Sequence, residues 1–401
     1  KRRSPMRSAR SSSAAVARRC LSTAKIGHSG HLSAEALRNQ HDVPAAVAGL
    51  THAQKYAFDL NGYLVLQNAF DEDMISRANV AIDAHLDQMF ERTGKLRTSG
   101  LYGRESRALA GDGSTGRFDL GGMLGWAAPH REPFRELLSH PTIAGALIDL
   151  VGVGYRLDHS PLMIAQEKGS EGHTLHGGAV TEAGEPAWPL AYEFRHGHMR
   201  NQLLTVCMQL HDAPAGAGGF CVVPGSHKSN FSVPPALADL SEGCPPELAE
   251  LVRQPALAPG DCLLFTEAVL HGTLPWAADH QRRTVIYRFA PAGSAYGRGT
   301  QTAPAQTRAP ANPPPPPLAR SRRSLPDGRL PPVQRLPGYT PSWPAEALEG
   351  MSEAQAAVMQ PPFHPRMNRT YVSKDGEALT AKPRESFKVE FDEKVFGSRY
   401  F

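Results

Sequence analysis

The chain of 401 residues has no long hydrophobic run, few cysteines and, outside its first residues, no excess of positive charge. No apolar stretch approaches the roughly 18 residues that a membrane-spanning helix needs. The five cysteines show no Cys-x-x-Cys spacing, and three of them lie in apolar, strand-like runs. We therefore expect buried free thiols and no disulfide framework. The length allows one large domain with extensions, or two domains.

Acidic residues are missing from the first part of the chain. Residues 1–25 contain eight Lys and Arg and no Asp or Glu, and they are rich in Ser and Ala. This composition is typical of an organellar transit peptide, which favours a mitochondrial or plastid location. The alternative is a disordered basic tail on a cytoplasmic protein. Outside this segment, 35 basic residues stand against 39 acidic ones, so we expect no nucleic-acid partner.

The composition divides the chain into four parts. Residues 1–50 form the basic segment, which we expect to be disordered, and residues 51–292 form the folded body. Residues 293–342 are rich in Pro and Arg and include five consecutive prolines, so we expect little order there. Residues 343–401 form a C-terminal extension with a short helix over residues 351–359.

The body begins with helical patterns and continues with short strands. Asp71 is the expected N-cap of a helix that runs to Phe90, because apolar residues recur there every three or four positions. More helix is expected over residues 131–151, and the Gly-rich residues 98–125 are expected to form a loop. Short apolar strands are expected over residues 203–210, 218–223, 261–265 and 284–289. This order predicts a mainly β domain with flanking helices (α+β), built on a double-stranded β-helix of the jelly-roll, cupin-like kind.

Two histidine motifs carry the strongest chemical signal. One is His173-Thr174-Leu175-His176-Gly177-Gly178, and the other is His271-Gly272, which follows an apolar strand that begins after Gly260-Asp261. Neutral imidazole is a good ligand for Fe(II), and two strands of a rigid barrel can each hold one. We interpret His176 and His271 as metal ligands. His173 is the alternative to His176, and a core histidine is the structural alternative for each.

An arginine pair, Arg282-Arg283, lies 11 and 12 residues after His271. A guanidinium binds a carboxylate through two parallel hydrogen bonds, which a lysine ammonium cannot match. Because side chains alternate across a strand, only one of the two arginines can face the same interior as His271. The pair therefore predicts an anchor for a carboxylate ligand near the metal site.

Taken together, these motifs resemble the phytanoyl-CoA dioxygenase family of Fe(II)/2-oxoglutarate oxygenases. Residues 58–70 are similar to the opening element of that family. Leu210-His211-Asp212, followed by residues 218–228, is similar to its most specific segment. The Gly-Asp pair, His271-Gly272 and Arg282 match its distal half. The resemblance covers residues 51–292.

The resemblance implies a site and a reaction. His176 and His271 would hold Fe(II), and Arg282 would bind the far carboxylate of 2-oxoglutarate. Arg283 is the alternative, since a strand register inferred from sequence can be wrong by one residue. O2 would be the oxidant, 2-oxoglutarate would become succinate, and a small organic or lipid-like substrate would be hydroxylated. Residues 98–126 and 179–198 are expected to line the substrate pocket.

One ligand of the family pattern is missing. The carboxylate normally stands two residues after the first His, where this chain has Gly178. One reading is that Glu182, Glu185 or Glu193 completes the site, which favours hydroxylation. A second is that the vacancy admits water or a halide, because iron/2-oxoglutarate halogenases likewise carry Gly or Ala there. The third is a non-catalytic binding protein that retains the barrel. An aspartate at position 178 is expected to rebuild the usual ligand set.

Other readings explain fewer of these residues. A zinc-dependent, cupin-like hydrolase would need three protein ligands and would leave the arginine unexplained. A scaffold would need neither His271 nor Arg282. His227, in a Pro-Gly-Ser-His-Lys run, and Asp212, after a strand, are expected to serve turns and not the metal.

Overall fold

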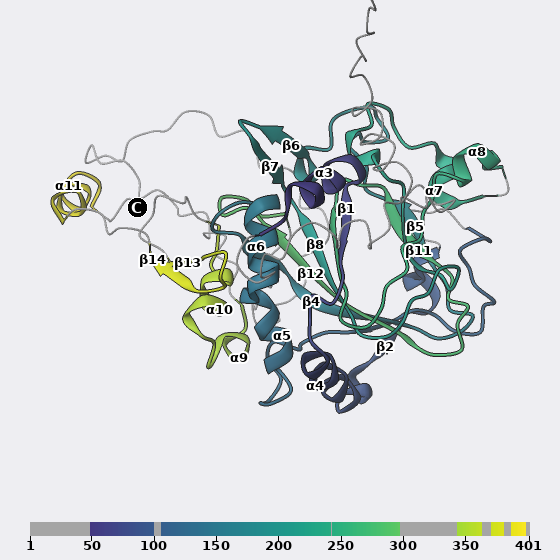
Figure 1. Ribbon diagram of the computed structural model, residues 1–401, viewed down its shortest axis with the longest axis horizontal. Helices are drawn as coiled ribbons and strands as arrows, with labels where there is room; N and C mark the ends of the chain where they lie inside the picture. Colours follow the sequence, from purple (N-terminus) through teal and green to yellow (C-terminus); the bar gives the residue numbers. More distant parts are fainter. Residues whose placement is uncertain are drawn as a thin grey trace, which may run out of the picture.

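The computed structural model describes residues 49–99, 106–241, 243–296, 343–362, 370–380 and 386–397. The predicted transit-like segment lies outside these residues, as does the Pro/Arg-rich segment from residue 297 to residue 342. Figure 1 shows two facing β-sheets with helices along one side of the larger sheet.

The larger sheet joins strands from both halves of the body, and every pair of neighbours runs antiparallel. Its strands are, in spatial order, β1 (Tyr63–Leu66), β10 (Cys262–Thr266), β8 (Leu204–Gln209), β12 (Arg282–Ala290), β4 (Arg156–Gln166), β3 (Phe118–Leu120) and β2 (Phe90–Glu91). Three of the four predicted apolar strands lie here. The last of them, β12, begins two residues earlier than predicted, at Arg282 itself.

The smaller sheet contains β5 (His173–His176), β11 (His271–Leu274) and β9 (Gly219–Val222), in that order. It faces the larger sheet across the molecule (Figure 1). Both predicted histidine motifs therefore lie on neighbouring strands of one sheet. The fold is mainly β with flanking helices, a double-stranded β-helix, and the predicted fold class is confirmed.

Alternation along β12 separates two environments. Arg282, Thr284, Ile286 and Arg288 face a cavity between the two sheets. The residues between them, Val285, Tyr287 and Phe289, are buried in the main hydrophobic core on the other face of the sheet. This period of two is what a strand with two covered faces requires.

The N-terminal helices confirm one expectation and correct another. Helix α3 (His52–Asn61) is followed by α4 (Glu72–Asp83), and the Asp71 side chain accepts from the backbone N–H of Met74 at 2.8 Å, as an N-cap does. The prediction that α4 runs to Phe90 is wrong. Phe90 pairs with Asp119 of β3, because a long-range strand partner outweighs a local helical periodicity.

The predicted loop over residues 98–125 is also partly wrong. It contains β3, whose residues pair with Ala165, Ile164 and Met163 of β4. A three-residue strand is too short to show alternation, so the pairing comes from β4 and not from a local signal.

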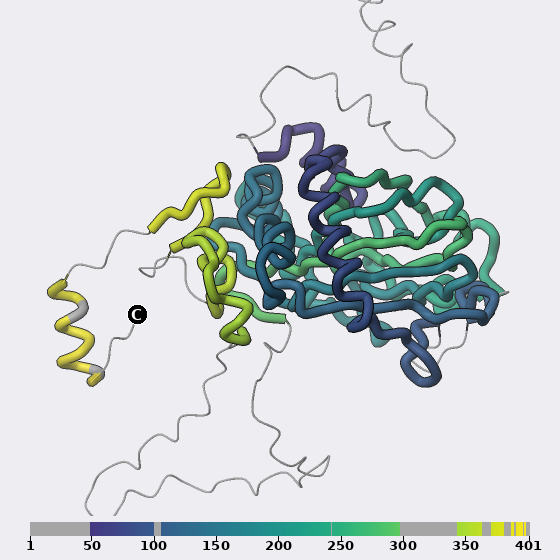
Figure 2. The backbone as a smooth tube through the Cα atoms, turned by 90° about the horizontal axis from the view of Figure 1, so that it is seen from below, coloured from purple at the N-terminus to yellow at the C-terminus, as the bar shows by residue number. Residues whose placement is uncertain are grey.

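Helices α5 (Glu132–Glu136) and α6 (Pro141–Leu150) lie along the larger sheet, as predicted, with a break before Pro141. The C-terminal segment with α9 (Ala345–Leu348) and α10 (Glu353–Val358) packs beside them, on the side away from the sheets (Figure 2). The fully buried Arg135 donates to the carbonyl oxygens of Leu124 and Glu349, which joins this segment to the body.

The predicted helix over residues 351–359 is confirmed by α10. The remaining helices and strands are α7 (Pro235–Asp239), α8 (Pro246–Ala249), α11 (Ser386–Phe396), β6 (Tyr192–Arg195), β7 (His198–Asn201), β13 (Thr370–Val372) and β14 (Ala378–Thr380). Among the described helices, none is long and apolar enough to cross a membrane. The four described cysteines are free, and three of them are buried, as predicted.

Candidate active site

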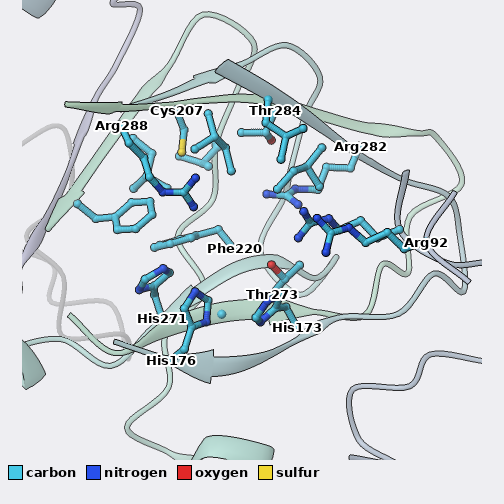
Figure 3. A pocket seen from close by; sticks show the side chains of 18 residues that line it. Arg92, His173, His176, Cys207, Phe220, His271, Thr273, Arg282, Thr284 and Arg288 are labelled. Atoms are coloured by element: carbon cyan, nitrogen blue, oxygen red, sulfur yellow. The ribbon is translucent and has the colours of Figure 1, made fainter. Parts of the chain in front are cut away.

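A cavity of about 230 Å³ lies between the two sheets. Three histidines lie along one wall of it, and arginines lie across from them (Figure 3). Phe220 and Phe265, with leucine and isoleucine side chains from the larger sheet, supply apolar surface between these polar groups. The cavity therefore combines groups that can ligate a metal, groups that can bind an anion and an apolar lining.

The structure brings the two predicted ligands together. His176 ends β5 and His271 begins β11, and the two residues are directly paired across the strands. Their ring centroids lie 4.3 Å apart. The Nδ1 atom of His176 lies 3.0 Å from the carbonyl oxygen of Thr174, and Nδ1 of His271 lies 2.8 Å from that of Val269.

These backbone contacts determine the tautomer of both rings. A carbonyl oxygen only accepts a hydrogen bond, so Nδ1 carries the proton and Nε2 keeps its lone pair. Burial lowers the pKa of His271, and burial together with His271 and His173 lowers the pKa of His176 well below its usual value. Both imidazoles are therefore neutral near pH 7, which is the state that binds a metal ion.

His173 faces the same cavity. Its ring centroid lies 4.5 Å from that of His176, and its Nδ1 lies 2.7 Å from the carbonyl oxygen of Thr174. Burial, with smaller contributions from Arg117 and Arg92, lowers the pKa of His173 to about 4. His173 thus stays neutral, and it stands nearer to the cationic side of the cavity.

Arg282 is the arginine of the pair that faces the cavity. It is 3% exposed, and its Nη1 donates to Oε1 of Gln166 at 2.8 Å, while its Nε has no hydrogen-bond partner in the described structure. Burial lowers the pKa of Arg282 to about 10. A buried, charged guanidinium with an unused N–H fits a carboxylate ligand.

Arg283 points the other way and is not part of the cavity wall. Its Nη1 lies 2.7 Å from Oδ1 of Asp83, on helix α4. The alternative in which Arg283 anchors the carboxylate is therefore wrong, and strand alternation decides the matter as expected.

Three further arginines, which the motifs did not predict, line the cavity: Arg92, Arg117 and Arg288. Arg92 and Arg117 both donate to the carboxylate of Asp119, and both face the space beside Arg282. Arg92 directly follows the short strand β2, and Arg117 directly precedes the short strand β3. No periodicity marks them in the sequence, since their place depends on the pairing of β3 with β4.

The region around Gly178 corrects several expectations. Gly178 has φ +101°, and a Cβ atom there would lie 3.4 Å from Cγ2 of Val233, which is not a cavity residue. An aspartate at this position would be strained and directed away from the histidines, so it would not rebuild the usual ligand set.

The predicted glutamate substitutes do not reach the cavity either. Glu182 and Glu185 are exposed, and Glu193 lies in the β6–β7 hairpin opposite Arg200. None of the three is among the residues that line the cavity. The expectation that residues 179–198 form part of the pocket wall is wrong, whereas residues 98–126 contribute Arg117.

Glu267 is a carboxylate beside the histidines that sequence reasoning missed. It is 6% exposed, and its Oε2 lies 3.7 Å from Nε2 of His271. Burial opposes its ionisation, but Arg288, His271 and the Thr205 hydroxyl outweigh burial and hold the pKa of Glu267 well below its usual value. The available signal was its spacing of four residues before His271.

Two other polar residues, His227 and Asp212, are not among the residues that line the cavity. His227 is buried, and its Nε2 donates to the carbonyl oxygen of Asp59 at 3.1 Å. Asp212 lies in the segment between β8 and β9, and its backbone carbonyl oxygen accepts from Nε2 of His280. Among the described residues, no group of three His, Cys, Asp or Glu side chains lies close enough together to hold a metal ion without movement of a side chain.

The fold and the cavity define a double-stranded β-helix with a histidine pair and an opposing arginine. A family model described as Phytanoyl-CoA dioxygenase (PhyH) matches residues 58–284, more than half of the chain. The chain therefore belongs to the phytanoyl-CoA dioxygenase family, and the resemblance read from the motifs is confirmed.

Several solved structures are similar to this chain. HygX from Streptomyces hygroscopicus with iron bound is 19% identical, with 62% of this chain and 90% of that chain covered and a TM-score of 0.48. SnoK, a non-heme alpha ketoglutarate dependent carbocyclase from nogalamycin biosynthesis, is 17% identical, with 62% and 87% covered and a TM-score of 0.41. EctD from S. alaskensis with 2-oxoglutarate and 5-hydroxyectoine is 17% identical, with 64% and 86% covered and a TM-score of 0.41. A comparison with curated proteins gives no match.

Proposed function

We propose that the protein is a non-haem Fe(II)/2-oxoglutarate-dependent oxygenase that hydroxylates a small organic or lipid-like substrate. One observation carries this proposal. Two neutral histidines, each anchored to a backbone carbonyl, and a buried arginine with an unused N–H face the same cavity. Membership of the family supports the same class of chemistry.

The residues fit the two groups that this chemistry needs. His176 and His271 would hold Fe(II) through their Nε2 lone pairs, because their Nδ1 atoms are already engaged. Arg282 would bind the far carboxylate of 2-oxoglutarate, and Gln166 keeps its guanidinium oriented toward the cavity. When bound together, Fe(II) and 2-oxoglutarate supply the oxidation of a C–H bond by O2.

The rest of the cavity controls what can enter. Phe220 and Phe265 pack against the ring of His271, with centroids 6.2 Å and 4.6 Å away. They give the histidine pair an apolar surrounding that excludes water. The apolar side chains of β4 and β10 extend this surface and suit the hydrocarbon part of a substrate.

Spectroscopy tests the proposal without knowledge of the substrate. Under anaerobic conditions, addition of Fe(II) and 2-oxoglutarate should give a weak visible charge-transfer band, because both must bind at one site. The band should be missing in Arg282→Met and retained in Arg283→Met. A folded protein that binds iron but gives no band with 2-oxoglutarate, and forms no succinate, would overturn the oxygenase reading and favour the binding-protein reading.

Halogenation is the second candidate, and Gly178 is the observation that favours it, since the usual carboxylate is not supplied there. Once a substrate is found, products formed with and without chloride separate the two reactions. Chlorinated product would establish halogenation, and hydroxylated product alone at high chloride would exclude it.

A further inference from the structure

Glu267 stands beside the histidine pair, in the turn between β10 and β11. We propose that Glu267 supplies the anionic metal ligand that Gly178 cannot, so that His176, His271 and Glu267 together hold the ion. This inference rests on the proposed function, because it completes the same site. It moves the carboxylate from the strand of the first histidine to the turn that precedes the second.

The gap between Glu267 and His271 has the chemistry of a cation site. Nδ1 of His271 faces the carbonyl of Val269, so the Nε2 atom that faces Glu267 carries a lone pair. Two acceptors therefore face each other across 3.7 Å, which is too long for a hydrogen bond. Two ligand bonds of about 2.1 Å each span up to about 4.2 Å, so one ion can bridge the gap.

The carboxylate is held in a way that leaves one oxygen for the ion. Oε1 accepts from the Thr205 hydroxyl and from Nε of Arg288, the latter at 2.8 Å. Among the described residues, both of these hydrogen bonds are made to Oε1. The other oxygen, Oε2, faces His271. Such outer partners are what orient a carboxylate ligand.

The glycine pair and the Glu267 turn are sterically linked. A Cβ atom on Gly177 would lie 2.5 Å from the carbonyl oxygen of Val269 and 2.8 Å from that of Glu267. The N–H of Gly178 also donates to the carbonyl oxygen of Ala268 at 2.9 Å. The turn that carries Glu267 can come this close only because position 177 has no side chain. Gly177 thus allows the close approach of the Glu267 turn, and the backbone N–H of Gly178 holds the turn against the end of β5.

His173 is the rival third ligand, and charge decides against it. Arg117 and Arg92 line the same cavity as His173, and their positive charges disfavour a divalent cation on that side of the cavity. The cavity wall includes four arginines and no carboxylate. Two carboxylates lie beside these arginines: Asp119 pairs with Arg92 and Arg117, and Glu267 pairs with Arg288. An anionic ligand at Glu267 offsets the charge of the ion, whereas a third neutral imidazole does not. The side chains must still close around the ion, and the three rotatable bonds of Glu267 permit this.

Metal titration of the ligand-free protein tests the proposal independently of turnover. Glu267→Gln keeps the shape and can still accept from Thr205 and Arg288, but it removes the charge. We expect it to weaken anaerobic Fe(II) binding at least tenfold and to change the visible spectrum of the Co(II) form. His173→Gln is the matched control and should bind both ions within about threefold of wild type. Equal binding by Glu267→Gln, or a larger loss in His173→Gln, would overturn the assignment.

A second measurement uses the unaltered protein, in case Glu267→Gln does not fold. Crystals of the wild-type protein soaked with Ni(II) should show Oε2 of Glu267 within about 2.2 Å of the ion. An ion bound to both histidines but not to Oε2 of Glu267 would overturn the proposal while the proposed function stands. If wild-type protein binds neither Fe(II) nor Co(II), both the proposed function and this inference fail.

Discussion

Replacement of Arg282 by methionine should separate the stability of the protein from its function. The guanidinium is buried, and burial lowers its pKa to about 10, against about 12.5 for an ordinary arginine. That difference corresponds to about 3 kcal/mol of unfavourable free energy for the charge in the folded protein. Loss of the charge-assisted hydrogen bond to Gln166 costs about 1.5–3 kcal/mol. The free energy of unfolding of ligand-free Arg282→Met should therefore rise by about 1 kcal/mol.

Arg282→Met should weaken the binding of 2-oxoglutarate, although it should stabilise the ligand-free protein. Removal of a charged partner from a buried carboxylate costs about 2–5 kcal/mol, or a loss of affinity of roughly 30- to 5000-fold. The assay is urea unfolding in the presence of Mn(II), with and without 2-oxoglutarate. Wild type should gain about 2.7 kcal/mol at a hundred times its Kd, and Arg282→Met should gain at most about 0.9 kcal/mol at that concentration.

Arg283→Met is the matched control from the other face of β12. Its partner Asp83 is 56% exposed, so the ion pair contributes only about 0–1 kcal/mol. The variant should lose at most that much stability and should bind 2-oxoglutarate as wild type does. If Arg282→Met binds 2-oxoglutarate normally, or if Arg283→Met shows the larger loss of affinity, the assignment of the anchor is wrong.

Other residues give further expectations. His271→Ala should lose more than about a hundredfold in metal affinity while circular dichroism shows an unchanged fold; full metal stoichiometry would contradict this. Burial lowers the pKa of His227 to about 4. On acidification from about pH 6.5 to 4, His227 therefore binds a proton in the unfolded chain but not in the folded protein. Wild type should then lose up to about 3 kcal/mol of stability relative to His227→Gln over that range. The same pH dependence of the free energy of unfolding in both proteins would refute this expectation. Gly177→Ala should lower the free energy of unfolding by at least about 1–3 kcal/mol, because the new side chain would be strained and would contact Val269. Gly184 has a similar φ but open space around it, so Gly184→Ala should lower the free energy of unfolding less. Equal losses in the two variants would argue against the close approach of the turn to Gly177.

Much of the fold and part of the site could be predicted from local patterns. The strands β8, β9, β10 and β12 show as apolar runs between turn residues, and Asp71 marks the start of α4. The period of two in a strand is a property of consecutive residues, so it also decided that Arg282 and Arg283 face opposite sides. The end of α4 was wrong because Phe90 has a strand partner far away in the sequence.

The sequence by itself predicted the class of protein, and it predicted that His176, His271 and Arg282 face one cavity, since each prediction depends on a short motif and on strand alternation. Only the tertiary structure decided which further charges face the cavity. Arg92 and Arg117 reach it through the pairing of β3 with β4, and no sequence pattern encodes that register. Glu267 lies only four residues before His271, yet the direction of its side chain depends on a turn packed against Gly177 and on hydrogen bonds from Thr205 and Arg288. Such contacts join residues that are far apart in the chain, and only the folded backbone brings them together.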